Sequence, residues 1–137
     1  MEKVADILGR KYPRFNFVAA HCYVSDALYQ MVGENVDHLV VQEGDKFIGI
    51  ITDHDIASKV LFDERALNTI PVKEFMSKTL PVAMPDDSLE NCMQLMERFQ
   101  VRHIVIYDDF TFKGVISSHD LMQEALSKRN GVPEASQ

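Results

Sequence analysis

Two short motifs in the sequence place a hydroxyl three positions before a carboxylate. They are Thr52 with Asp55, and Ser117 with Asp120. Each follows a glycine and two apolar residues and leads into another apolar stretch, as expected where a strand ends and a helix begins. A helix start offers free backbone N–H groups and a positive dipole to a phosphate, and a carboxylate accepts two hydrogen bonds from a vicinal diol. Residues of these types can therefore bind both groups at one helix start.

The same spacing is also typical of a capping box, in which the two side chains satisfy the free N–H groups of the helix itself. Taken alone, the four residues favour this structural role. The two roles are compatible, because the hydroxyl of Thr52 or Ser117 can cap the helix while the aspartate faces a ligand. The surroundings of the motifs decide between them.

Both motifs belong to an internal repeat. Residues 36–56 match residues 101–121 without a gap, at an offset of 65 positions and with eight identities. Ordinary residue usage predicts about one or two identities over such a length. Each copy has about 60 residues, a size at which a lone unit is only marginally able to bury its core. The chain is therefore predicted to consist of two copies of one unit that depend on each other.

Within each copy, the hydrophobic periodicity predicts the order strand, helix, strand, strand, helix. Apolar residues at helical spacing begin at Val24 and at Leu89, and each such stretch is followed by two β-branched runs joined by a turn. Short first strands are expected at Phe17–Ala19 and Val82–Ala83. The fold class is therefore α/β, with the strands and helices arranged as an α+β unit that occurs twice.

Two further helices are expected outside this pattern. Pro71 is placed to begin a connector helix over 72–76, and apolar residues at 4, 7 and 8 predict a small leading helix. We assign the leading helix and the first repeat to residues 1–66. The connector, the second repeat and a C-terminal tail are assigned to residues 67–137.

Composition and charge exclude several classes of protein. The longest apolar runs are far shorter than the roughly 20 residues of a membrane-spanning helix, so no membrane insertion is expected. The N-terminus carries acids where an export signal has a basic flank, which makes a cytoplasmic location the expectation. A formal charge of −7 disfavours nucleic acid as a main partner. Cys22 and Cys92 lack the close pairing of zinc or redox motifs, and no disulfide is predicted.

Histidines occur inside both motifs, which raises the question of a metal. His54 and His119 are each adjacent to the motif aspartate, and adjacent residues are not spaced as a ligand pair on one helix face. The repeat explains their recurrence without chemistry. We predict no metal site and leave open a contact from either histidine to a phosphate.

The two repeats resemble the cystathionine beta-synthase (CBS) domain pair, also called a Bateman module. The resemblance rests on a strand ending in Gly and two apolar residues, then Thr or Ser, two further residues, Asp and an apolar residue. The matching residues are Gly49, Thr52, Asp55 and Ile56 in the first copy, and Gly114, Ser117, Asp120 and Leu121 in the second. The connector from Ile70 to Met76 also fits, and the match covers about residues 10–127. Two tandem CBS repeats packed with pseudo-twofold symmetry are implied.

By this resemblance, the chain is expected to be a regulatory module that binds an adenosyl ligand in clefts between the two repeats. The ligands implied are AMP, ADP, ATP or S-adenosylmethionine. Asp55 and Asp120 are the residues implied for the ribose hydroxyls, and Thr52 and Ser117 for the ribose or phosphate. Backbone and apolar walls for adenine are implied at Phe17, Val18, Ala19, Val82 and Ala83. The resemblance also implies a homodimer formed through the helices, and a regulated protein partner is a further expectation.

The copies differ next to the motifs. Arg102 stands where the first copy has Asp37, and Lys113 where it has Ile48. A cation near one motif favours an anionic ligand there, so we expect the site served by Arg102 to bind nucleotide better. The alternative is that Arg102 is a solvated charge at a strand edge.

A second function remains open from the sequence. The clefts could be vestigial, leaving an assembly module whose helical faces dimerise or dock on another protein. The net negative charge slightly favours this alternative, because it makes free ATP a poorer ligand than AMP, Mg-ATP or cationic S-adenosylmethionine. Catalysis is not expected, since the sequence shows no P-loop, no dinucleotide-binding glycine loop and no nucleophile–base pair by spacing. No cofactor is required by this interpretation.

Overall fold

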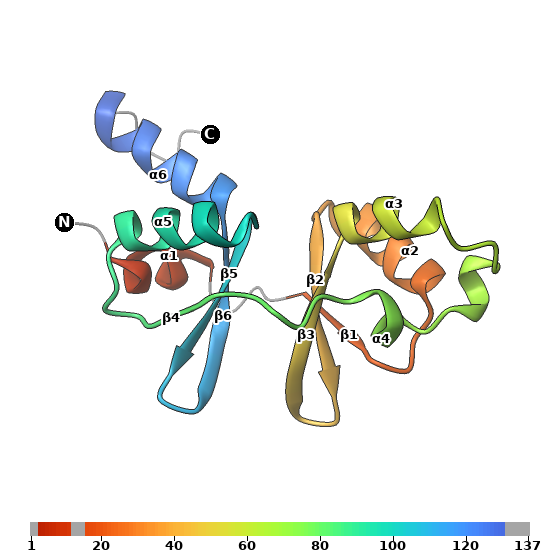
Figure 1. The fold of residues 1–137 in the computed structure, drawn as a ribbon. Helices are drawn as coiled ribbons and strands as arrows, with labels where there is room; N and C mark the ends of the chain where they lie inside the picture. Colours follow the sequence, from red (N-terminus) through yellow and green to blue (C-terminus); the bar gives the residue numbers. More distant parts are fainter. Residues whose placement is uncertain (1–2, 12–15, 131–137) are drawn as a thin grey trace. The chain divides into compact units, whose positions relative to one another are not determined.

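The computed structural model describes residues 3–11 and 16–130 and contains two three-stranded sheets with helices (Figure 1). In chain order the elements are α1 (Val4–Lys11), β1 (Phe17–Ala19), α2 (Val24–Glu34), β2 (His38–Glu43), β3 (Lys46–Thr52), α3 (Asp53–Val60), the 3-10 helix η1 (Leu67–Thr69), α4 (Val72–Phe75), β4 (Val82–Ala83), α5 (Leu89–Phe99), β5 (His103–Asp108), β6 (Thr111–Ser117) and α6 (Ser118–Asn130). The expected C-terminal tail from residue 131 lies outside the described residues. No helix within the described ranges is long and apolar enough to cross a membrane.

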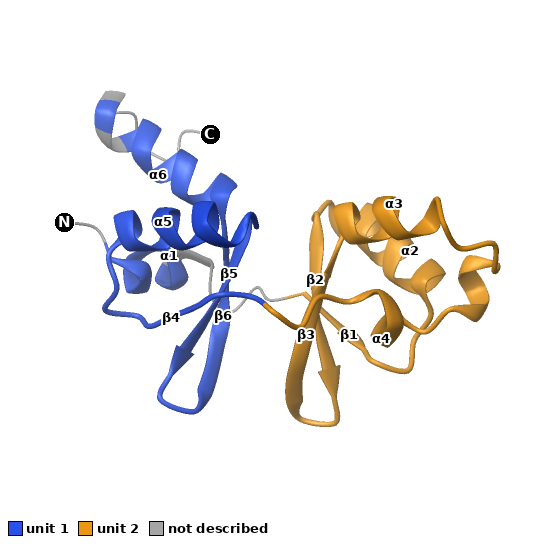
Figure 2. Cartoon of the chain, viewed as in Figure 1, with its two compact units in different colours: residues 1–13, 80–137 blue, residues 14–79 orange. Residues whose placement is uncertain are grey.

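The elements gather into two compact units, coloured separately in Figure 2. The first-repeat unit comprises residues 14–79, and the second-repeat unit comprises residues 1–13 and 80–137. The expected boundary between residues 66 and 67 follows the repeat along the chain. The packed units instead exchange helices across that boundary, because α1 packs in the second-repeat unit and α4 in the first-repeat unit.

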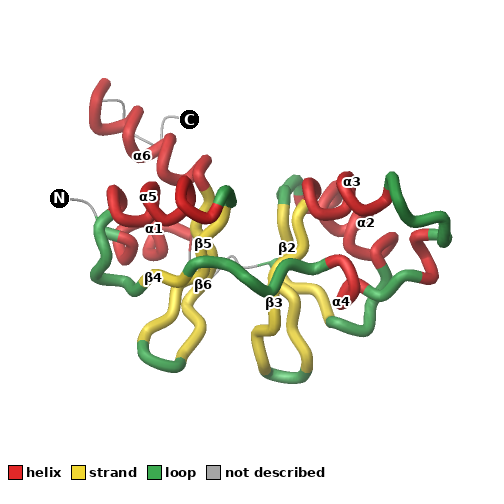
Figure 3. The backbone as a smooth tube through the Cα atoms, in the orientation of Figure 1, coloured by secondary structure: helices red, strands yellow, loops and turns green. Residues whose placement is uncertain are grey.

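Both sheets have the same strand order, which can be followed in Figure 3, and the same register. The short strand pairs parallel with the first strand of a hairpin, whose two strands pair antiparallel. His38 lies opposite Thr52 in one sheet, and His103 lies opposite Ser117 in the other. The register shifts after Val41 in one hairpin and after Ile106 in the other. Residues 65 positions apart therefore occupy equivalent places in the two sheets, and the irregularity in the hairpin register is repeated as well. The predicted fold class is confirmed.

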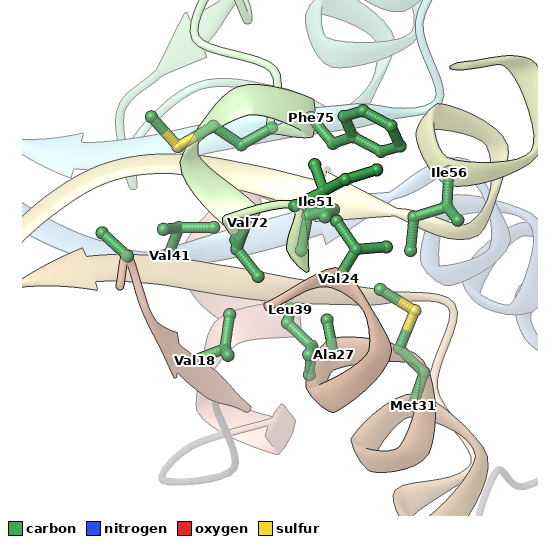
Figure 4. Close-up of a cluster of buried hydrophobic side chains, with 13 residues drawn as sticks. Val18, Val24, Ala27, Met31, Leu39, Val41, Ile51, Ile56, Val72 and Phe75 are labelled. Carbon is green, nitrogen blue, oxygen red and sulfur yellow. The ribbon is translucent and has the colours of Figure 1, made fainter. Parts of the chain in front are cut away.

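The first-repeat unit has its core between the sheet and the helices (Figure 4). Leu39 and Val41 alternate along β2, so both side chains point to the face that the helices cover. Val24, Ala27 and Met31 recur along α2 at the three- and four-residue spacing that gives a helix one apolar face. The core also takes Val72 and Phe75 from α4. This packing fixes where β3 ends and α3 begins.

The second-repeat unit has an equivalent core, completed by the leading helix. Its buried residues are Val4, Ile7, Ala83, Cys92, Met96, Ile104, Ile106, Ile116 and Leu121. The backbone N–H of Val4 donates to the carbonyl of Asp87 at 3.0 Å, and that of Val72 donates to the carbonyl of Cys22 at 2.7 Å. Because residues 22 and 87 are one repeat apart, α1 occupies in one unit the place that α4 occupies in the other.

Candidate functional site

In the first-repeat unit, the Thr52 motif sits where β3 passes directly into α3. Thr52 is the N-cap of α3 and has extended backbone angles. Its Oγ1 accepts from the backbone N–H of Asp55 at 3.0 Å, and its own N–H donates to Asp55 Oδ2 at 3.1 Å. Both side chains thus satisfy donors that a helix start leaves without an intrahelical acceptor. The capping-box interpretation of this motif is confirmed.

The Ser117 motif repeats this arrangement in the second-repeat unit. The Ser117 N–H donates to Asp120 Oδ2 at 2.8 Å, and the Asp120 N–H donates to Ser117 Oγ at 3.2 Å. Thr52 and Ser117 are buried, whereas Asp55 and Asp120 are half-exposed. Each carboxylate is therefore held by the backbone in a fixed position beside the first turn of a helix. In chemical terms, each unit presents a positioned anion next to a positive helix end.

The carboxylate of Asp55 has a further partner from the segment 70–77, which is called the connector from here on. The hydroxyl of Ser77 lies 3.0 Å from Asp55 Oδ1 and 3.2 Å from Oδ2 and donates to this carboxylate. Sequence reasoning missed Ser77, because nothing in the motif spacing points to a residue 22 positions away. An indirect signal is the small size of Gly49, which permits a close approach of another segment to β3.

The motif histidines are exposed in the first turns of their helices. Neither His54 nor His119 belongs to a group of three potential metal ligands among the residues that the structure describes. Their position at the helix surface leaves both imidazoles accessible to solvent. The contact from either histidine to a phosphate stays a prediction.

Asp37 and Arg102 lie directly beside the two motifs. The carbonyl of Asp37 accepts from the N–H of Asp53, the first residue of α3, at 3.0 Å. In the same way, the carbonyl of Arg102 accepts from the N–H of Ser118, the first residue of α6, at 2.9 Å. One helix start therefore has an acidic neighbour and the other a basic one. Asp37 is also bonded to the ring of His38, with its Oδ1 2.9 Å from Nδ1.

The β1 residues line a pocket at the hairpin end of their sheet. This pocket has a volume of about 350 Å³ and is bounded by Phe17, Val18, Ala19, Ala20, His21, Gln42, Glu43 and Gly44. Ala19 pairs with Gln42, four positions along β2 from His38, which pairs with Thr52. At about 3.3 Å per residue, that is about 13 Å along the strand. The structure thus brings the β1 residues to a pocket whose lining does not include Thr52 or Asp55.

Burial separates the predicted adenine-contacting residues into two kinds. Val18 is 5% exposed and Ala83 is 2% exposed, and both side chains belong to the cores of their units. Phe17 and Val82 are exposed, and Ala19 is half-exposed. Val18 and Ala83 therefore have only their backbones to offer a ligand. Five lining residues that the sequence did not single out complete the β1 pocket, namely Ala20, His21, Gln42, Glu43 and Gly44.

Comparisons with known proteins place this arrangement in a family. The family model described as "CBS domain" matches twice, over residues 4–61 and 72–127. The CBS domain-containing protein YhcV of Bacillus subtilis is 33% identical over 107 residues, which are 78% of this chain and 76% of YhcV. The chain covers only 20% and 21% of two further relatives, named as an L-aspartate semialdehyde sulfurtransferase and a homoserine O-acetyltransferase. The matched region is thus a small part of those longer proteins.

Solved structures show the same fold. The crystal structure of the CBS domain of NE2398 superimposes with a TM-score of 0.86 at 28% identity, covering 93% of this chain and all of that chain. The CBS domain pair of protein MJ0100, solved in complex with 5-methylthioadenosine and S-adenosyl-L-methionine, superimposes with a TM-score of 0.78. That pair covers 93% of this chain and 98% of its own, at 22% identity. The likeness to MJ0100 is one of fold, and its ligands belong to that protein.

Proposed function

The chain belongs to the CBS domain family, and from this premise we propose that it is a regulatory module that senses an adenosine-containing ligand. The binding groups are the carboxylates of Asp55 and Asp120, which would accept the ribose hydroxyls. The observation that carries the proposal is the matched geometry of these two residues, each bonded to a backbone N–H at the start of a helix. The MJ0100 pair, a protein of this fold, binds two adenosyl compounds, which supports this ligand class.

The geometry suits a nucleoside that carries a charged group. A carboxylate that is already held by one backbone N–H still has acceptor sites for the hydroxyls of a vicinal diol. The first turn of the helix directs N–H groups and a positive dipole toward the same place, which favours a phosphate. Thr52 and Ser117 are occupied in capping, so we assign them to holding the helix start and place His54 and His119 at the exposed rim.

The two sites are proposed to differ in their preference for charge. Arg102 lies beside the Ser117 motif, and Asp37 lies beside the Thr52 motif. A guanidinium attracts a phosphate, whereas a carboxylate repels it. We therefore assign the better AMP, ADP or ATP site to the second-repeat unit. A cationic ligand such as S-adenosylmethionine is better tolerated in the first-repeat unit.

Thermal unfolding with a ligand panel tests the proposal. The panel contains AMP, ADP, ATP with and without magnesium, and S-adenosylmethionine, applied to wild type, Asp55→Ala and Asp120→Ala. A ligand at about 100 times its Kd adds about 2.7 kcal/mol to the free energy of unfolding, which raises Tm by several degrees. We expect a shift that one of the two aspartate variants removes. A folded protein that responds to no adenosyl compound contradicts the proposal.

The role of Arg102 needs its own comparison. Arg102→Ala should weaken AMP binding by about two- to fivefold, the range of one partly solvated charge contact. Arg98→Ala removes the same charge from the last turn of α5 and serves as the matched control. Equal AMP affinities for wild type and Arg102→Ala would make Arg102 a solvated charge at a strand edge instead.

A second candidate, an assembly module, is favoured by exposed apolar side chains on α2 and directly after α3 in the first-repeat unit. Tyr29, Val32, Leu61 and Phe62 are each 79% to 88% exposed, and exposed apolar residues that form one patch mark interaction sites. A homodimer through such helical faces is the proposed assembly. Light scattering should then give the mass of a dimer, and Leu61→Ser with Phe62→Ser should shift it toward the monomer. A wild-type monomer at high concentration contradicts this candidate.

A further inference from the structure

The carboxylate of Asp55 is already in contact with a hydroxyl from its own chain. Ser77 donates to this carboxylate from 3.0 Å and 3.2 Å, while Oδ2 also accepts the N–H of Thr52 at 3.1 Å. A vicinal diol that binds Asp55 through both hydroxyls needs an acceptor site on each carboxylate oxygen, and the Ser77 hydroxyl lies within hydrogen-bond distance of both oxygens. Ser77 thus stands in the protein where a ribose hydroxyl would stand in the proposed complex.

The main chain holds Ser77 in this position independently of the hydroxyl. Its N–H donates to the carbonyl of Ile50 at 2.7 Å, and its carbonyl accepts from the N–H of Ile50 at 3.1 Å. This bridge passes next to Gly49, where a Cβ would lie only 2.7 Å from the Ser77 carbonyl oxygen. The connector is therefore fixed against β3 before the side chain of Ser77 makes any contact.

Helix α3 contacts the end of the connector at two points. Asp55 binds the Ser77 hydroxyl, and one turn further along the helix the ammonium of Lys59 donates to the carbonyl of Phe75 at 2.8 Å. Asp55 and Lys59 are four residues apart and lie on the same side of the helix. A change at Asp55 is thus a change in how α3 holds the connector.

We propose that Ser77 is an internal competitor for the ligand at Asp55, so that binding a vicinal diol displaces its hydroxyl and loosens the connector from α3. This inference rests on the proposed function and specifies the regulation of the site in the first-repeat unit. Displacement begins with rotation of one small side chain, and the loss of its hydrogen bond to Asp55 makes opening of the main-chain bridge between Ile50 and Ser77 easier. It gives ligand occupancy at Asp55 a direct effect on the segment that links the two repeats.

The test compares adenosine affinities in proteins where only the Asp55 site remains. Asp120→Ala is the background, and Ser77→Ala is added to it. The matched control adds Ser58→Ala instead. The Ser58 hydroxyl donates to the backbone carbonyl of Asp55 at 3.2 Å and not to its carboxylate. Adenosine is the probe because it carries the diol without a phosphate. Far-UV circular dichroism and urea unfolding verify that all variants fold.

We expect Ser77→Ala to tighten adenosine binding by about tenfold, the effect of removing one hydrogen bond to a charged acceptor. Ser58→Ala should leave the affinity unchanged. The 2′,3′-dideoxy analogue should gain nothing from Ser77→Ala, since it has no diol to take the vacated position. Hydrogen exchange at the amides of Ile50 and Ser77 should accelerate when adenosine binds the Asp120→Ala protein.

The possible failures are distinguishable. Binding to the background protein with an unchanged or weaker affinity after Ser77→Ala overturns the inference and leaves the proposed function standing. Binding by wild type that all three Asp120→Ala proteins lack also overturns it, and confines the proposed function to the second-repeat unit. No binding of adenosine by any protein overturns the inference, and the proposed function falls with it only if the nucleotide and S-adenosylmethionine panel also raises no Tm.

Discussion

Gly49 of β3 and Ser77 of the connector are packed backbone against backbone. A Cβ placed on Gly49 would lie 2.7 Å from the carbonyl oxygen of Ser77 and 3.0 Å from the sulfur of Met76. Any larger residue must therefore push the connector away from the strand. The glycine that begins each motif has a steric function in this unit, because it admits the segment that carries Ser77 to the Asp55 carboxylate.

Gly49→Ala is accordingly expected to destabilise the protein. The new methyl group meets backbone, which cannot rotate aside, so the change resembles overpacking of a core and should cost about 1–3 kcal/mol. Urea unfolding measures the loss. Gly33→Ala in α2 is the control, since nothing lies within 4 Å of a Cβ there and alanine is the better helix former by up to about 1 kcal/mol. Equal effects of the two changes would contradict the steric account.

Thr52→Ala should weaken the start of α3. It removes the oxygen that accepts the N–H of Asp55 at 3.0 Å, and loss of an N-cap side chain typically costs about 0.5–2 kcal/mol. Thr52→Ser keeps the oxygen, as Ser117 does in the other unit, and should remain within about 0.5 kcal/mol of wild type. Urea unfolding of the three proteins gives both values. If serine loses as much stability as alanine, packing of the threonine methyl group matters more than the cap.

The repeat made most of the fold predictable from the sequence. Eight identities at one offset fixed the two hairpins and their following helices, and the register confirms the offset at His38 opposite Thr52 and His103 opposite Ser117. The capping boxes followed from side-chain spacing, because residues three apart at a helix start are neighbours. These features depend on contacts that are close in sequence.

Contacts between segments that are distant along the chain were not predicted from the sequence. The apolar face of α1 indicated that it packs somewhere, but Val4 and Ile7 fit the core of the second-repeat unit, about 80 residues further along the chain in sequence. Ser77 is a small polar residue in a connector, and its pairing with Ile50 is a main-chain contact that carries no side-chain pattern. The β1 pocket likewise depends on a turn, from Gln42 to Gly44, that only the folded hairpin brings near His21.

The packing of α1 makes a specific prediction about Ile7. This residue is 4% exposed in the core of the second-repeat unit, so Ile7→Ala should cost about 2–4 kcal/mol through lost burial and a cavity. Leu8 is only half-buried and its change to alanine should cost less. In the Ile7→Ala protein, native-state hydrogen exchange at the amides of β6 and α5 should be faster than in wild type. Acceleration confined to β2 and β3 would contradict the assignment of α1 to this unit.

The Cys92 thiol makes the free energy of unfolding depend on pH in the alkaline range. Its side chain is fully buried, and burial, with a smaller effect of the Asp87 charge, raises the pKa of the thiol to about 11. The unfolded thiol loses its proton near pH 8.5. Between these two pH values the unfolded state therefore binds fewer protons than the folded state. The contribution of the Cys92 thiol to the free energy of unfolding is complete below about pH 8.5 and is lost as the pH rises toward 11.

Ionisation of the Cys92 thiol is expected to lower the free energy of unfolding by up to about 1.4 kcal/mol per pH unit. Tyrosines and lysines also titrate in this range, so the informative quantity is the difference between wild type and Cys92→Ala in urea unfolding from pH 8 to pH 11. Cys92→Ala should be less stable at pH 8, because it leaves a small cavity, and should lose less stability as the pH rises. Parallel curves for wild type and Cys92→Ala would show that the Cys92 thiol ionises in the folded protein as readily as in the unfolded chain.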